Sequence, residues 1–278
     1  MPFERRYAQL YDAMYSEKDY AFEVSQVLEF ARRYGVAART IVDYGCGTGS
    51  HARRFAERGI KVYGIDCSRH MLAVAREKTK RLPNVEFLHD SELSAVPEGS
   101  VDIFCLLFDV VSYVVENDAL DHLLSYIVSR LKRQGLFVFD FWYGPSVLAL
   151  RPVNRWKEFE ANGARVLRLT RAELHRDNST VTVEHEIIMI QGDQVKDRFV
   201  DNHVMRFFFK KEIDSFMKAH ELEVVQFGTW QDPESAPTTN DWSAVIVGRR
   251  RGSTACLENE RRQYVEHQDA RRKRSVRM

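Results

Sequence analysis

A glycine-rich turn carries the most specific chemistry in this sequence of 278 residues. Residues 40–44 (Thr-Ile-Val-Asp-Tyr) predict a short buried strand, residues 45–49 (Gly-Cys-Gly-Thr-Gly) a tight turn, and residues 51–58 a helix. A strand, turn and helix N-terminus place bare backbone N–H groups beside a crevice at the carboxyl ends of the strands, where open α/β sheets bind ligands. The sequence therefore predicts a ligand site at this turn.

A carboxylate is expected at the same edge, because Asp66 ends the next predicted strand, residues 61–65. An acidic side chain at that place can accept two hydrogen bonds from a ribose diol. Ser50 stands where the dinucleotide fingerprint has its third glycine, which disfavours a nicotinamide dehydrogenase, and no Gly-Lys-Ser/Thr follows to form a phosphate cradle. An ordinary turn with a surface aspartate is the structural alternative.

Residues 42–49 resemble motif I of the class I S-adenosylmethionine-dependent methyltransferases, and residues 62–66 (Val-Tyr-Gly-Ile-Asp) resemble the second strand of that family. The resemblance implies an α/β fold with a Rossmann-like, seven-stranded, mostly parallel sheet. It also implies S-adenosylmethionine as the cofactor and S-adenosylhomocysteine as the product. In this family Asp43 would orient the methionine ammonium, directly or through water, and Asp66 would hold the ribose. The cofactor-binding residues that the resemblance implies are Tyr11, Tyr20, Asp43, Gly45, Cys46, Gly47, Asp66, Cys67, Met71, Asp90, Ser91, Leu107 and Phe108.

Two further stretches correspond to the family's adenine pocket. Met71 follows Asp66 by five residues, where the family packs a side chain on the adenine ring, a role compatible with plain core packing. The third predicted strand, residues 85–88, ends at His89-Asp90-Ser91, where the family usually has Gly-Asp. By resemblance, Asp90 accepts a hydrogen bond from the adenine amino group and the Ser91 backbone N–H bonds the ring.

The N-terminal residues 1–35 are predicted to form helices that act as a lid. This stretch holds Tyr-Asp-x-x-Tyr at residues 11–15, followed by Asp-Tyr at residues 19–20. It resembles the lid of small-molecule N-methyltransferases, notably the amino-sugar N,N-dimethyltransferases, whose tyrosines close over the methionine end of the cofactor. The matching positions here are Tyr11, Tyr15 and Tyr20. Burial of the rings against the sheet, with hydroxyls bonded at the rim, is the alternative.

Acceptor-binding residues are expected after two of the core strands. Residues 108–113 follow the apolar run 101–107, where the family places residues under the transferable methyl group. Tyr113 stands where the amino-sugar enzymes tend to have a histidine. Trp142 and Tyr143 end the predicted strand at 136–141 and suit either a substrate wall or a structural turn.

Beyond Pro145 the pattern changes to β-rich segments separated by turn signals. It predicts an antiparallel β cap, residues 146–204, inserted over the active site. His203-x-x-Arg206-x-Phe208 resembles a stretch of the same N-methyltransferases and makes His203 and Arg206 candidate substrate contacts, together with Tyr15, Trp142 and Tyr143. The candidate catalytic residues are Tyr11, Tyr113 and His203.

No metal site is expected in the cap. Glu184 and Glu186 share one face of a predicted strand, while His185 between them points to the other face. Methyl transfer from a sulfonium also needs no metal. Solvated strand residues are the simpler interpretation of this stretch.

The sequence predicts four parts: the lid (1–35), a cofactor-binding core (36–145 and 205–250), the cap (146–204) and a disordered tail (251–278). The formal net charge is +1, but residues 249–278 hold ten Lys or Arg against four Asp or Glu, so the body is acidic and nucleic acid is not an expected partner. No apolar run reaches membrane-spanning length, and the N-terminus lacks a signal-peptide pattern. We therefore expect a cytoplasmic monomer or homodimer with reduced cysteines.

The predicted function is methyl transfer to a small molecule, by resemblance the amine of an amino sugar that is possibly nucleotide-linked. An amine attacks with its own lone pair and needs no strong base, whereas a hydroxyl acceptor would need one, and His203 would be the better candidate. The alternatives are an O-methyltransferase of sugars or other metabolites, an RNA or protein methyltransferase that uses the basic tail, and a non-catalytic cofactor-binding protein.

Overall fold

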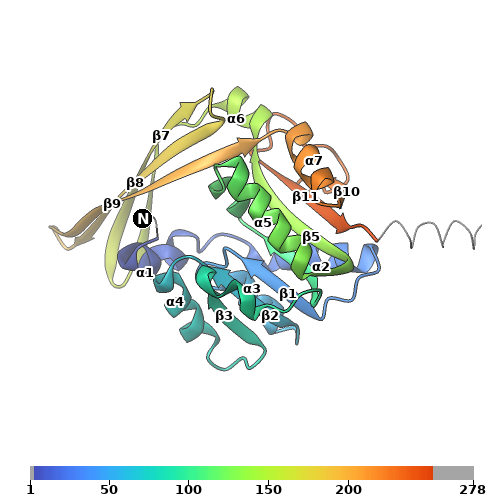
Figure 1. The fold of residues 1–278 in the computed structure, drawn as a ribbon. Coiled ribbons are helices and arrows are strands. Elements are labelled where there is room, and N and C mark those ends of the chain that lie inside the picture. Colours follow the sequence, from blue (N-terminus) through green and yellow to red (C-terminus); the bar gives the residue numbers. More distant parts are fainter. Residues whose placement is uncertain (1–2, 253–278) are drawn as a thin grey trace, which may run out of the picture.

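The computed structural model describes residues 3–252 and shows a mixed β-sheet with helices on both faces (Figure 1). The α/β class predicted from the sequence is confirmed. Neighbouring strands of the core follow the order β3 (Val85–His89), β2 (Lys61–Asp66), β1 (Thr40–Tyr44), β4 (Val101–Leu106), β5 (Leu131–Tyr143), β11 (Ser243–Arg250) and β10 (Leu222–Gly228). The first five strands are parallel, whereas β11 runs antiparallel to β5 and β10.

The sheet is covered on both faces because successive side chains of a strand point to opposite sides. Ile41 of β1 packs in one core with helices α2 (Tyr20–Arg33), α3 (Ser50–Ala56) and α4 (Arg69–Thr79). Val42, the next residue, packs in a second core with α5 (Asn117–Arg130) and α7 (Lys210–Ala219). Buried on both sides, the parallel strands need the near-continuous apolar runs seen in the sequence.

The cap is an antiparallel sheet of β6 (Arg155–Ala161), β7 (Ala164–His175), β8 (Thr180–Gln191) and β9 (Gln194–Phe208). Its last strand continues into the core, where Phe207 and Phe208 pair in parallel with Trp142 and Tyr143 of β5. The cap boundary predicted at residue 204 therefore falls inside β9. Phe207 packs in one apolar cluster and Phe208 in another, so β9 stays a continuous strand where it passes from the cap into the core.

Short elements join the cap and lid to the core. Helix α1 (Arg5–Met14) lies beneath the cap, and α6 (Gly144–Leu150) follows β5, with a proline in its first turn where the missing N–H has no cost (Figure 1). Two 3₁₀ turns, η1 (Asp90–Ala95) and η2 (Val110–Tyr113), follow β3 and β4. The sequence did not predict α6.

Within residues 3–252, no helix is long and apolar enough to cross a membrane. In the same range Cys46, Cys67 and Cys105 are free thiols. The basic tail predicted at 251–278 lies outside the described residues from residue 253 onward.

Candidate active site

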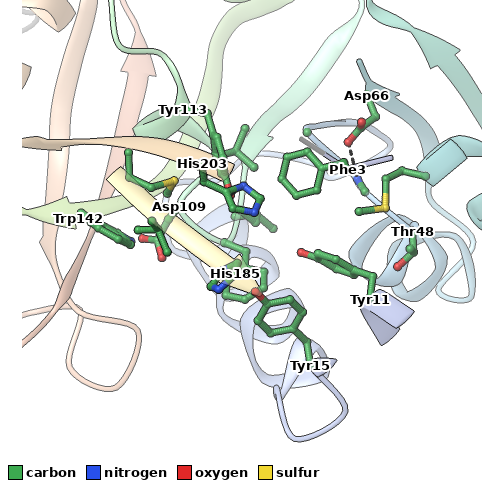
Figure 2. Close-up of a pocket in the computed structure, with 18 of the residues that line it drawn as sticks. Phe3, Tyr11, Tyr15, Thr48, Asp66, Asp109, Tyr113, Trp142, His185 and His203 are labelled. Atoms are coloured by element: carbon green, nitrogen blue, oxygen red, sulfur yellow. Dashed lines mark hydrogen bonds between the residues drawn. The ribbon is translucent and has the colours of Figure 1, made fainter. Parts of the chain in front are cut away.

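A cavity of about 780 Å³ lies between the carboxyl edge of the core sheet, the lid and the cap (Figure 2). The loops after β1 and β4 form one wall, α1 contributes Tyr11, and inward-facing side chains of β7, β8 and β9 form the opposite wall. A cavity of this size can hold a cofactor together with part of an acceptor. Fifteen residues predicted from the sequence line it: Tyr11, Tyr15, Tyr20, Gly45, Cys46, Gly47, Asp66, Cys67, Met71, Asp90, Leu107, Phe108, Tyr113, Trp142 and His203.

The glycine turn is packed too tightly for a side chain at its first position. Gly45 has a φ of +72°, and a Cβ there would lie 2.5 Å from Cγ1 of Val110 in the loop after β4. The N–H groups of Gly45 and Cys46 both donate to the Ile65 carbonyl of β2, at 2.7 and 2.9 Å. The turn is therefore fixed between β2 and the β4 loop, with its backbone along the cavity.

Asp66 is held by the backbone around it. Its Oδ2 accepts from the Gly47 N–H at 2.8 Å and its Oδ1 from the Ser68 N–H at 2.7 Å. Burial raises the pKa of this carboxyl, while the two N–H donors oppose the rise. A carboxylate has about four lone-pair sites, so both oxygens can still accept from a ligand hydroxyl.

Asp43 is deeply buried at the end of β1. It is 1% exposed, does not line the cavity, and has no hydrogen-bond partner for Oδ2 among residues 3–252. Burial raises its pKa to about 6, against the opposing effects of His51 and the Ala52 N–H. Any contact with a ligand ammonium would therefore need an intervening water.

The three lid tyrosines line the same cavity as the glycine turn. The rings of Tyr11 and Tyr15 lie 4.8 Å apart, and Tyr20 meets the His51 ring edge to face at 4.9 Å. Burial raises the pKa of Tyr11 and Tyr20 well above that of a free phenol, so both hydroxyls stay protonated. The Tyr20 hydroxyl has no partner among the described residues.

The loop after β4 presents a carboxyl that the sequence analysis did not select. Phe108 and Asp109 adopt φ values of +72° and +60°, and Asp109 lines the cavity. Its N–H donates to Oδ1 of Asp140 at 2.9 Å, and Ser243 Oγ donates to its own Oδ1 at 2.9 Å. Burial, and then the charge of Asp140, raise the pKa of Asp109 to about 8. The one available signal was that Asp109 interrupts an otherwise apolar run.

Two histidines of the cap face the same space. His203 Nδ1 lies 3.2 Å from the Tyr113 hydroxyl, and its ring centroid lies 5.2 Å from that of His185. Burial lowers the pKa of His203 to about 4 and that of His185 to about 3, so both imidazoles are neutral near pH 7. His203 Nε2 has no hydrogen-bond partner among residues 3–252. Sequence reasoning selected His203 but missed His185.

Arg168 of β7 is a second residue that sequence reasoning missed. It is 7% exposed, lines the cavity, and stacks over the Tyr15 ring with Cζ 5.3 Å from the centroid. Its Nε and Nη1 have no partner within residues 3–252. A buried cation without a counter-charge is costly unless a ligand supplies one. Its place on the inner face depends on the register of β7, which no local motif reveals.

Besides Asp43, three other candidates do not line the cavity. The Ser91 hydroxyl bonds His89 Nδ1 at 2.8 Å, and the Tyr143 ring packs 6.0 Å from Phe227. Arg206 donates to the Val115 carbonyl at 2.8 Å and also pairs with Glu212. Arg206 thus joins β9 to the segment before α5.

Glu184 and Glu186 share one strand face as predicted, but the expectation of solvated residues is wrong for Glu186 and His185, which are both buried. Glu184 and Glu186 both pair with Arg171, at 2.6 and 3.0 Å, while His185 points inward and bonds Thr170 at 3.0 Å. Among the described residues, no three His, Cys, Asp or Glu side chains are grouped to hold a metal.

Part of the core matches a known domain. Residues 41–135 match the model of a methyltransferase domain. A putative methyltransferase of Geobacillus sp. strain WCH70 is 33% identical over 136 residues, which are 48% of this chain and 55% of that protein. The dTDP-3-amino-3,4,6-trideoxy-α-D-glucopyranose N,N-dimethyltransferase of Streptomyces venezuelae is 26% identical over 228 residues, 80% of this chain and 92% of that enzyme.

Solved structures share the fold. DesVI of Streptomyces venezuelae superposes with a TM-score of 0.71 at 23% identity, over 88% of this chain and 99% of that one. An S-adenosylmethionine-dependent methyltransferase from Clostridium acetobutylicum superposes with a TM-score of 0.72 at 17% identity, over 89% and 98%. Each superposition spans most of this chain.

Proposed function

We propose that the chain is an S-adenosylmethionine-dependent methyltransferase that methylates the amine of a nucleotide-linked amino sugar. The methyltransferase domain matched by residues 41–135 and the similarity to an amino-sugar N,N-dimethyltransferase support this proposal. One observation carries the proposal: a single cavity joins the glycine turn and Asp66 to a cap wall with an unpaired buried arginine. The first part suits an adenosyl cofactor, and the second suits an anionic acceptor. The relatives named as dTDP-amino-sugar dimethyltransferases support the same acceptor class.

The residues at the sheet edge fit the cofactor. Gly45 and Gly47 leave the backbone free of side chains, Asp66 would accept from the ribose hydroxyls, and Tyr11 and Tyr20 would cover the methionine end. Once bound there, S-adenosylmethionine supplies a methyl group activated on a sulfonium. The chain's own contribution is then position and exclusion of water. We retain the prediction that Met71 and Asp90, which line the cavity, face the adenine.

The cap wall supports a phosphate-bearing acceptor. Arg168 offers two unpaired donors on a buried guanidinium, and Arg151 and Arg155 line the same cavity. A guanidinium binds phosphate oxygens in a bidentate way, which returns the missing counter-charge. The acceptor's diphosphate would therefore lie on β7, with its sugar directed toward the β4 loop.

We also propose how the chain is divided into parts and in which cell compartment it acts. The methyltransferase sheet consists of seven strands in the order β3, β2, β1, β4, β5, β11 and β10. Strands β6–β9 form its cap, and the lid lies at the N-terminus. The sheet order and the antiparallel β11 support this division. The free thiols Cys46, Cys67 and Cys105 support the cytoplasm.

The test is a methylation assay on purified protein with S-adenosylmethionine and a panel of dTDP-linked 3-amino and 4-amino sugars, read by mass spectrometry. We expect a methylated amino sugar and stoichiometric S-adenosylhomocysteine. dTDP-glucose, with a hydroxyl in place of the amine, is the matched control. Turnover on the hydroxyl sugar alone would replace the proposal by O-methylation, and turnover on neither would reject this acceptor class.

A further inference from the structure

One carboxyl oxygen of Asp109 accepts a hydrogen bond from the protein, and the other does not. Oδ1 accepts from Ser243, whereas Oδ2 has no hydrogen-bond partner within residues 3–252. The backbone is held in the left-handed region, at a φ of +60°, and its N–H is bonded to Asp140. Such a conformation is sparsely populated in a non-glycine residue and persists only when the surroundings hold it. The loop is thus fixed so that the carboxyl faces the cavity.

The groups around Asp109 are predominantly acidic. Asp140 of β5 lies beside it, and Glu23 of α2 adds a second like charge. Lys18 opposes them, but it is itself paired with Glu23. Ser243 of β11 and Trp230, which donates to Asp140 at 3.0 Å, are neutral donors. The surroundings therefore favour a ligand that brings a positive charge.

Two tryptophan side chains line the same cavity. Trp142 and Trp242 both line it, with ring centroids 5.2 Å apart in an edge-to-face arrangement. Ser243, the donor to Asp109, follows Trp242 and pairs with Trp142 across β11 and β5. Figure 2 labels both Asp109 and Trp142 among the residues that line the cavity. A carboxylate with indole faces is a usual environment for an alkylammonium ion.

We propose that Asp109, together with Trp142 and Trp242, binds the acceptor as its ammonium ion and takes its proton before methyl transfer. This rests on the proposed function, because it requires an amine acceptor. One N–H bond of the ammonium breaks and its proton moves to Asp109 Oδ2. The freed nitrogen lone pair then forms the N–C bond as the C–S bond of the sulfonium breaks, and the proton on Asp109 passes to solvent. His203, neutral and bonded to Tyr113, is left as a positioning residue.

Without a ligand, the carboxyl holds a proton at neutral pH, because burial and Asp140 raise its pKa to about 8. An ammonium ion in contact with it favours the charged form and lowers that pKa. Binding of a cationic acceptor must therefore release a proton to the solution near pH 7. A carboxyl with a purely structural role would not couple acceptor binding to proton release.

The experiment is calorimetric titration of the S-adenosylhomocysteine complex with a dTDP-3-amino sugar at pH 7, in buffers of different ionisation enthalpy. Wild type should release close to one proton per acceptor bound, and Asp109→Asn close to none. We expect Asp109→Asn to lower kcat/KM by about 100-fold near pH 7, the usual range for loss of a proton acceptor. The loss should shrink at high pH, where the acceptor arrives already neutral.

Asp140→Asn is the second variant, because it removes the like charge and leaves Asp109 in place. Proton release at pH 7 should fall while the acceptor still binds. If Asp109→Asn keeps the proton release of wild type, the assignment of Asp109 is overturned. If wild type binds no amino sugar but still binds S-adenosylhomocysteine, the proposed function itself fails and this inference with it.

Discussion

The cofactor edge of the cavity and its cap wall differ in how their polar groups are satisfied. At the edge, both oxygens of Asp66 accept backbone N–H groups, and the turn's own N–H groups bond β2. On the cap wall, Arg168 and His203 leave buried nitrogen atoms without partners among residues 3–252. Buried polar groups are normally paired, so unpaired ones point to a partner outside the chain. Asp66 and the glycine turn are therefore preorganised by the chain, whereas the cap wall depends on its ligand.

Substitution of Asp66 is the most direct test of this contrast. We expect Asp66→Ala to weaken S-adenosylmethionine binding by about 100-fold, because a buried, charge-assisted hydrogen-bonding group is lost together with the anchor of Gly47. Calorimetric titration measures the affinity, and thermal unfolding without ligand checks the fold. Asp90→Ala, which removes a more exposed carboxyl from the same cavity, should have a smaller effect. Equal affinities of wild type and Asp66→Ala would contradict a preorganised ribose site.

A second prediction compares the stability cost of substituting two glycines that have nearly equal backbone angles. Gly45 and Gly35 have φ values of +72° and +67°, but only a Cβ at Gly45 would collide with Val110. Gly35→Ala should cost about 1–2 kcal/mol of unfolding free energy from the left-handed backbone alone. Gly45→Ala should cost about 1–3 kcal/mol more, from overpacking. Urea unfolding measures the loss of unfolding free energy in both variants. Equal losses would show that the turn can shift to accommodate a Cβ at residue 45.

The same contrast explains what the sequence could predict. The edge residues come from contiguous stretches, so strand, turn and carboxylate could be predicted from order and spacing alone. The cap residues meet only through strand register: Val183 pairs with His203, and Arg168 with Ile187. A shift of one residue would turn each of them outward, and no local motif fixes that register. Arg206 shows the converse, since its spacing suggested a substrate contact while its fold partners are Val115 and Glu212.

A third prediction tests the cap wall with two arginines of the same strand. Arg168→Gln should raise KM for a dTDP-amino sugar about tenfold, since a charge-assisted contact to the acceptor is lost, and leave S-adenosylmethionine affinity unchanged. Arg171→Gln is the matched control, because Arg171 is exposed and already paired with Glu184 and Glu186. Steady-state kinetics with both substrates measures the difference. An equal rise in both variants would mean that the cap's overall charge matters, and not the unpaired guanidinium.

The smallest expected effect concerns the pH dependence of stability in the cap. Burial lowers the folded-state pKa of His185 to about 3, below the ordinary value of about 6.5 for an unfolded histidine. As the pH falls below about 6.5, the unfolded chain takes up a proton that the folded chain does not, so stability is lost toward acid pH. His185→Gln removes this penalty. Between pH 7.5 and 5 the Tm of wild type should fall further than that of the variant, by a difference on the order of 2–4 °C.

The raised pKa values of Asp43 and Asp109 act in the opposite direction, but they are common to wild type and variant and cancel in this difference. His122→Gln, on the exposed face of α5, is the control for losing a histidine that is not buried. A gap between wild type and His185→Gln that does not change with pH would mean that the cap admits a charged imidazole. In that case water reaches the cap wall, and its unpaired Arg168 and His203 atoms would be hydrated without any ligand.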